Sequence, residues 1–129
     1  MKRHADFLGV LYLAWGAIFA LVGVAGLALA GGALAIARGG GPVSVGSEIA
    51  AGLTAVTFGT IAVLALVLGI LHLWLGAALR RFVPWARLLA LGLAVINLVL
   101  FPFGTALGAY AFWVLLTDEG RALYVAPAA

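Results

Sequence analysis

"VPWARLLALGLAVINLVLFPFGTALGAYAFWVLL", residues 83–116, decides how the second half of the chain folds. Two apolar runs are separated by Phe101-Pro102-Phe103-Gly104. Proline cannot continue a helical hydrogen-bond ladder and glycine tolerates either sign of φ, so these residues predict a tight turn. Pro84 suits the first turn of a helix. We therefore expect a helical hairpin with spans at about residues 85–101 and 105–119.

Two longer apolar runs precede this hairpin, at about residues 7–30 and 49–79. The second run would make roughly 46 Å of helix, well beyond a hydrocarbon core of about 30 Å, and the first can continue as helix to Ala37. Between them, Arg38-Gly39-Gly40-Gly41-Pro42 breaks the helix. Ser47-Glu48 suits a new helix start, because a serine oxygen and a carboxylate both favour an N-terminus.

The composition is typical of a membrane protein. Hydrophobic residues make up 67% of the 129 residues and charged residues 9%, with a mean hydropathy of +1.28. A soluble domain has roughly half apolar and a quarter charged residues. We therefore predict an all-α integral membrane four-helix bundle, a single transmembrane domain over residues 1–129 with two long helices followed by a short helical hairpin.

Basic residues predict the orientation. Six of the seven fall on one side of the predicted spans, and only Arg38 falls on the other. The positive-inside rule then places both termini in the cytoplasm. The run from Phe7 to Ala30 is longer than the apolar region of a signal peptide, so we expect an uncleaved first helix. The basic residues on the cytoplasmic side are Lys2, Arg3, Arg80, Arg81, Arg87 and Arg121.

Small residues recur at intervals of seven along both long segments. Such stripes let membrane helices approach closely, so they predict an antiparallel pair. Chance is the alternative, because 18 glycines produce some heptad matches by abundance alone. The predicted packing residues are Gly9, Gly16 and Gly23 in the first segment, Ala55, Ala62, Gly69 and Gly76 in the second, and Gly104-x-x-x-Gly108 in the fourth.

His72 and Asn97 are the candidate polar residues within the membrane. An ionisable histidine at that depth is a candidate proton carrier or ligand. The alternative is a neutral imidazole bonded to a neighbouring helix. Asn97 is expected to bond helices together, with a substrate contact as the alternative.

Residues for catalysis or metal binding are scarce. Cysteine is absent, and all four carboxylates lie at segment ends. We expect no catalytic residue, no metal and no cofactor, and hence no enzyme. The pI near 10.0 does not indicate nucleic acid binding, because the basic residues flank apolar segments. Anionic lipid headgroups are the expected partners of Arg80, Arg81 and Arg87.

The second half resembles a group of small, uncharacterised bacterial four-helix (tetraspan) integral membrane proteins. The similar residues are Trp85-Ala86-Arg87, the P-F-G-T-x-L-G-x-Y stretch that begins at Pro102, and Trp113-Val114-Leu115-Leu116. The resemblance implies a multi-pass protein of the bacterial inner membrane. It implies no activity or ligand.

These observations favour a structural or interaction component of the membrane, either self-associating as a homo-oligomer or bound to another membrane protein as an accessory subunit. The alternative is an oligomeric channel or transporter for a small solute. That alternative requires His72, Asn97 or the threonines of the second segment to face the axis of the oligomer.

Overall fold

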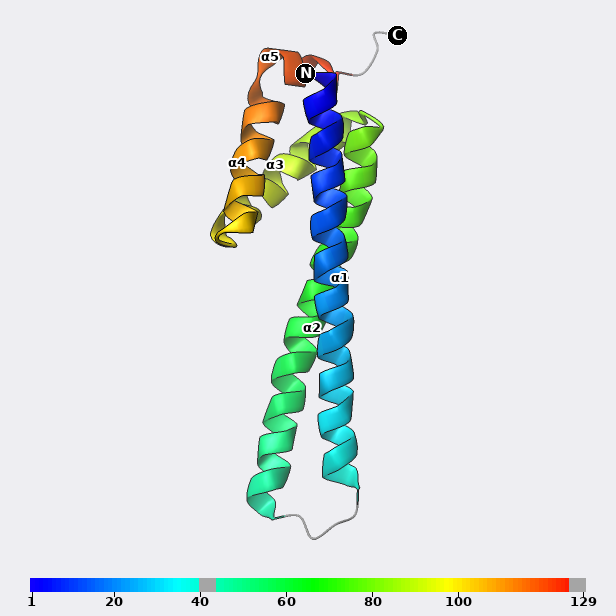
Figure 1. Cartoon of the computed structure of the whole chain (residues 1–129), viewed down its shortest axis with the longest axis vertical. Helices are drawn as coiled ribbons and strands as arrows, with labels where there is room; N and C mark the ends of the chain where they lie inside the picture. The colour runs from blue at the N-terminus through cyan, green and yellow to red at the C-terminus, as the bar shows by residue number, and fades with distance from the viewer. Residues whose placement is uncertain (40–43, 126–129) are drawn as a thin grey trace. The chain divides into compact units, whose positions relative to one another are not determined.

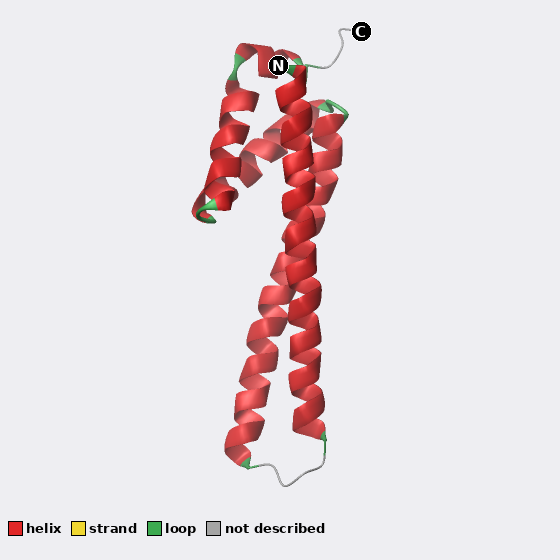
Figure 2. Ribbon diagram, viewed as in Figure 1, coloured by secondary structure: helices red, strands yellow, loops and turns green. Residues whose placement is uncertain are grey.

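The computed structural model describes residues 1–39 and 44–125, and this part of the chain is all-helical, with no strand (Figure 2). The all-α prediction is therefore confirmed. The helices are α1 (Lys2–Arg38), α2 (Val45–Arg80), α3 (Pro84–Val99), α4 (Phe103–Leu116) and the short α5 (Asp118–Ala122) (Figure 1).

The chain divides into two compact units. The terminal unit comprises Met1–Trp15 and His72–Ala129, and the central unit comprises Gly16–Leu71. The helices α1 and α2 contribute to both units, whereas α3, α4 and α5 belong to the terminal unit alone.

The helices α1 and α2 contain 37 and 36 residues, and both are long and apolar enough to cross a membrane by length and composition. Each extends beyond its predicted span, because neither Lys2–Arg38 nor Val45–Arg80 contains a proline. Residues 40–43 of the predicted link lie outside the described residues. Ser44, and not the predicted Ser47, caps α2, since its Oγ and backbone oxygen accept from the Ser47 amide at 3.4 and 2.9 Å.

The turn from α2 to α3 is a Schellman motif. The Val83 amide donates to the Ala78 oxygen at 3.3 Å, and the Phe82 amide donates to the Leu79 oxygen at 3.1 Å. Phe82 lies in the left-handed region, with φ of 54°, at the position where glycine is usual. Pro84 then begins α3, as the sequence predicts.

The turn from α3 to α4 lies where the sequence predicts it. The Leu100 amide donates to the Asn97 oxygen at the end of α3, and Pro102, which follows a cis peptide bond, precedes the first residue of α4. The fourth predicted segment, residues 105–119, is divided in two. Thr117 has extended backbone angles, and its side chain accepts from the Gly120 amide, so it ends α4 and caps α5.

The terminal unit has a continuous apolar core. The buried face of α3 is made of small side chains, since Ala86, Ala90 and Ala94 are each 0% exposed. Because alanine adds only a methyl group, neighbouring helices approach the α3 backbone closely. The larger buried side chains come from α1, α2, α4 and the segment after α5: Leu8, Tyr12, Leu75, Leu79, Leu107, Val114, Leu115 and Tyr124.

The central unit buries little besides its small residues. Gly16, Gly23, Ala30, Ala55, Ala62 and Gly69 are buried. Large apolar side chains on the same helical segments are exposed, including Leu21 (71%), Ile36 (80%) and Val56 (69%).

Candidate functional site

Three helices of the terminal unit bring Tyr12, His72 and Asn97 together, and each of these residues is 0% exposed. The His72 Nε2 and the Asn97 Oδ1 are 3.2 Å apart. An amide oxygen only accepts, so this hydrogen bond requires a proton on Nε2. The Tyr12 ring stacks on the imidazole with centroids 5.5 Å apart, and its hydroxyl donates to the Ala90 oxygen at 2.9 Å. We call these three residues the polar cluster.

The polar cluster joins α1, α2 and α3 through hydrogen bonds and ring stacking. The Asn97 Nδ2 is buried and has no hydrogen-bond partner among the described residues. The cluster contains no carboxylate, and its composition suits hydrogen bonding between membrane helices.

His72 and Asn97 are separate candidates in the sequence, and the structure brings them together. Tyr12 is not among the polar residues predicted from the sequence. A weak signal existed in the helical spacing of Ala5, Leu8 and Tyr12, which places the three on one face of the helix. In the structure all three are 0% exposed. That pattern identifies a buried face but not the helix that the hydroxyl contacts.

The predicted packing glycines of the terminal unit lie at backbone contacts between α1 and α2. A Cβ atom added to Gly9 would lie 3.0 Å from the Gly76 oxygen, and one added to Gly76 would lie 2.8 Å from the Gly9 oxygen. Both distances are below ordinary van der Waals contact. Only glycine lets the two backbones approach this closely.

The predicted glycines of the hairpin lie against the α3 backbone. A Cβ atom on Gly104 would lie 2.6 Å from the Asn97 oxygen, and one on Gly108 would lie 2.7 Å from the Ala94 oxygen. The G-x-x-x-G spacing therefore places α4 directly on α3, across the short turn that joins them (Figure 1).

The predicted packing residues of the central unit also lie between α1 and α2. A Cβ atom on Gly69 would lie 3.0 Å from the Gly16 oxygen, and one on Gly23 would lie 3.0 Å from the Ala62 oxygen. Ala55 is buried as well, with 8% exposure.

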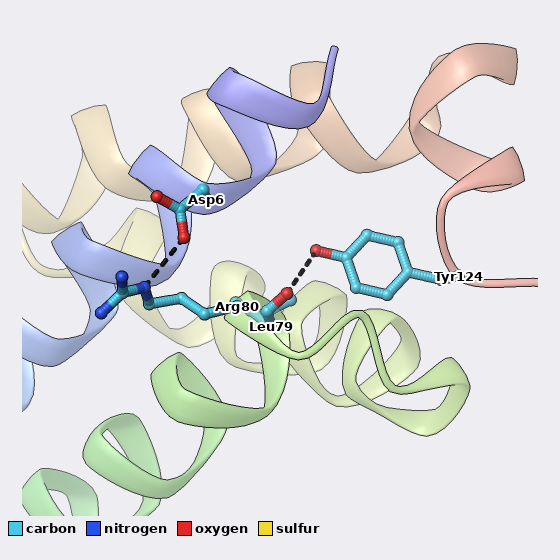
Figure 3. Close-up of polar contacts among 4 residues, drawn as sticks. All are labelled: Asp6, Leu79, Arg80 and Tyr124. Carbon is cyan, nitrogen blue, oxygen red and sulfur yellow. Dashed lines mark hydrogen bonds and ion pairs between the residues drawn. The ribbon is translucent and has the colours of Figure 1, made fainter.

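The three arginines predicted to contact headgroups differ in their surroundings. Arg80 Nε donates to Asp6 Oδ1 at 2.8 Å, and both side chains are about half exposed (Figure 3). Such a pair contributes at most about 1 kcal/mol. Arg87 Nε donates to the Leu115 oxygen at 2.9 Å. Arg81 is exposed, with no side-chain hydrogen bond to the described residues.

Tyr124 holds the segment after α5 against the end of α2. Its hydroxyl donates to the Leu79 oxygen at 3.2 Å (Figure 3), and its ring lies 5.7 Å from that of Phe82. Burial, followed by the negative charge of Asp6, raises the pKa of Tyr124 to about 12. The neutral hydroxyl is the form that donates this bond.

A groove follows the N-terminal end of α1 where α1 meets α4. It has a volume of about 440 Å³ and is lined by Arg3, His4, Phe7, Leu11 and Tyr110. His4 Nδ1 and the Tyr110 hydroxyl are 3.0 Å apart, and the Phe7 and Tyr110 rings meet edge-on at 6.2 Å. We call it the N-terminal groove. From the sequence, Arg3 contributes only to the predicted orientation and Tyr110 only to the stretch that carries the resemblance.

No group of three or more His, Cys, Asp or Glu residues gathers in the part of the chain that the structure describes. The expectation that the chain holds no metal and no cofactor stays a prediction.

The fold defines a helical protein with two candidate membrane-spanning helices. Comparison with protein-family models, with curated proteins and with solved structures gave no match. The function is therefore argued from the residues of this chain.

Proposed function

We propose that the chain is a non-enzymatic integral membrane protein that acts as a structural or interaction component of the bacterial inner membrane. In this proposal the chain crosses the membrane four times, with both termini in the cytoplasm. The observation that carries it is the exposure of large apolar side chains on the central unit, such as Leu21, Ile36 and Val56. Contiguous apolar surface of this kind is unfavourable in water and natural in lipid.

An interaction role is supported by what the polar side chains do. His72 and Asn97 bond to each other inside the terminal unit instead of facing outward. A further observation is the open space beside some glycines. A Cβ atom on Gly31, Gly32 or Gly52 would meet no described atom within 4 Å. A helix of a second copy or of another membrane protein can approach closely at such positions.

The same burial weighs against a channel or transporter. A pore lined by His72 or Asn97 requires those side chains to face an axis that solvent reaches, and both are 0% exposed. The His72→Ala variant separates the two functions in a liposome flux assay. Lower stability with unchanged flux supports the structural role, and loss of a pH-dependent flux supports the channel.

Cysteine labelling tests the membrane topology. Because the chain has no native cysteine, only the introduced cysteine can react. Single cysteines replace Ser44, Phe101 and Glu119, all of which are exposed. A membrane-impermeant maleimide added to intact spheroplasts is expected to label Ser44→Cys and Phe101→Cys. Glu119→Cys is expected to react only after permeabilisation.

Membrane retention is measured on the same cells by alkaline carbonate extraction. Release of the chain into the soluble fraction would overturn the proposal. Labelling of Phe101→Cys and Glu119→Cys from the same side would contradict the four-span topology. It would not contradict the membrane location. Native mass spectrometry of mildly extracted protein then identifies the partner, which is expected to be a second copy or another membrane protein.

A further inference from the structure

The N-terminal groove has a charged end and an apolar end. Arg3, Phe7 and Leu11 occur at intervals of four, so they lie along one face of α1 over about 12 Å. The order along this face is a cation, an aromatic ring and an aliphatic chain. Tyr110 of α4 forms the opposite wall.

The polar groups of this groove differ in how they are satisfied. His4 Nδ1 is bonded to the Tyr110 hydroxyl at 3.0 Å, and the imidazole also meets the Trp113 ring edge-on at 5.3 Å. Arg3 is exposed, and no salt bridge joins it to an acidic side chain among residues 1–39 and 44–125. The charged end of the groove therefore carries a cation without an anionic partner from the described chain.

We propose that the N-terminal groove binds one anionic phospholipid, with its phosphate on Arg3 and an acyl chain along Phe7, Leu11 and Tyr110. The proposal rests on the membrane location proposed above, and it names a site separate from Arg80, Arg81 and Arg87. Charge complementarity selects the anion, because a guanidinium binds phosphate oxygens through paired N–H donors.

The apolar end selects a lipid over a free anion. Phe7 lines the groove and is 54% exposed, so its ring is available to contact an acyl chain. The volume of about 440 Å³ lies within the range of small-molecule sites, so it holds the headgroup and the upper part of one chain. The rest of the lipid extends into the bilayer.

The experiment uses the full chain in mild-detergent micelles with equimolar phosphatidylglycerol and phosphatidylcholine of the same chain length. Native mass spectrometry measures the fraction of protein that retains each lipid. The wild-type chain is expected to retain phosphatidylglycerol in preference. Arg3→Gln is expected to lower that retention about fivefold, since one basic residue at a membrane surface contributes about that factor.

Lys2→Gln is the matched control. It removes the same charge one residue away, from an exposed side chain that does not line the groove. Near wild-type retention in Lys2→Gln supports the site, as does partial recovery in Arg3→Lys, which restores the charge but not the paired donors. Equal losses in Arg3→Gln and Lys2→Gln would overturn it, because generic charge would then explain the binding.

Leu11→Trp tests the apolar end, because a larger side chain there occupies the path of the acyl chain. Reduced retention of phosphatidylglycerol by a helical Leu11→Trp protein supports a bound lipid. Unchanged retention would overturn the lipid assignment in favour of a headgroup contact alone. Carbonate extraction of each variant keeps the two proposals distinct, since a chain that stays in the membrane but shows no lipid preference contradicts only the groove.

Discussion

The contact between α4 and α3 leaves no room for a methyl group at Gly108. A Cβ atom there would lie 2.7 Å from the Ala94 oxygen and 3.0 Å from the Leu98 Cγ. Ordinary contact begins near 3.4 Å, so Gly108→Ala requires the two helices to move apart by about 0.7 Å. The carbonyl cannot turn away, because it belongs to the backbone of α3. The adjustment therefore has to come from the helices themselves.

The magnitude follows from two opposing effects. Overpacking of a closed contact costs about 1–3 kcal/mol, and alanine is a better helix former than glycine by about 1 kcal/mol. Gly92→Ala on α3 is the matched control, since a Cβ atom there meets nothing within 4 Å among the described residues. Both variants gain the same helix propensity. The difference in the free energy of unfolding between them is therefore the cost of the contact, about 1–3 kcal/mol.

The assay is thermal unfolding of the full chain in mild-detergent micelles, followed by the near-UV circular dichroism of its tryptophans. Trp85 and Trp113 lie on the two helices of the hairpin and report its tertiary packing. The midpoint of Gly108→Ala is expected to fall below that of Gly92→Ala by roughly 4–12 °C. Equal midpoints, or a higher midpoint for Gly108→Ala, would refute close packing of α4 on α3.

Three further predictions concern the terminal unit. His72→Leu and Asn97→Leu should each lower stability by about 1–3 kcal/mol, because each removes the hydrogen bond between Nε2 and Oδ1. In a double-mutant cycle the two substitutions together should cost less than the sum of the single costs, and strict additivity would argue against the bond. The pKa of Tyr124 is about 12 when folded against an ordinary 10.0, so the folded chain holds this proton more tightly. The contribution of Tyr124 to the free energy of unfolding should be fully present below about pH 10 and should fall by roughly 2 kcal/mol as the pH rises to about 12. Denaturant titrations at each pH measure this loss, and Tyr124→Phe should remove it. Phe82→Gly should be more stable than Phe82→Ala by about 1 kcal/mol in the same titrations, since both lose the ring but only glycine accepts φ of 54° freely; the opposite order would contradict the left-handed backbone.

The helices and their small-residue contacts could be predicted because they depend on local pattern. Long apolar runs without proline specify α1 and α2, and the Pro102 turn specifies where the hairpin reverses. Intervals of seven selected Gly9, Gly76 and Gly69, and all three are buried. A heptad interval identifies a face, and two long faces of the same kind have few ways to pair.

The features that the sequence did not predict depend on contacts between distant residues. An aromatic residue such as Tyr12 is typical of a membrane interface. In the structure it is buried, and its hydroxyl donates to the Ala90 oxygen, 78 positions away in the chain. Phe82 occupies a position where glycine is usual, and its ring lies 5.7 Å from that of Tyr124, 42 positions later in the chain. The N-terminal groove likewise requires α4 to lie beside α1, and no local pattern places Tyr110 there.

The buried alanine face of α3 restricts which substitutions the hairpin tolerates. At Ala86, Ala90 and Ala94 only glycine is smaller, so almost every replacement adds volume where the exposure is already 0%. Compensation by shrinking a neighbour is also limited where that neighbour is Gly108, which has no side chain to lose. Variation in this hairpin is therefore expected to concentrate on the outward faces, while the inner face accepts little more than exchange between alanine and glycine, with serine as the smallest polar addition.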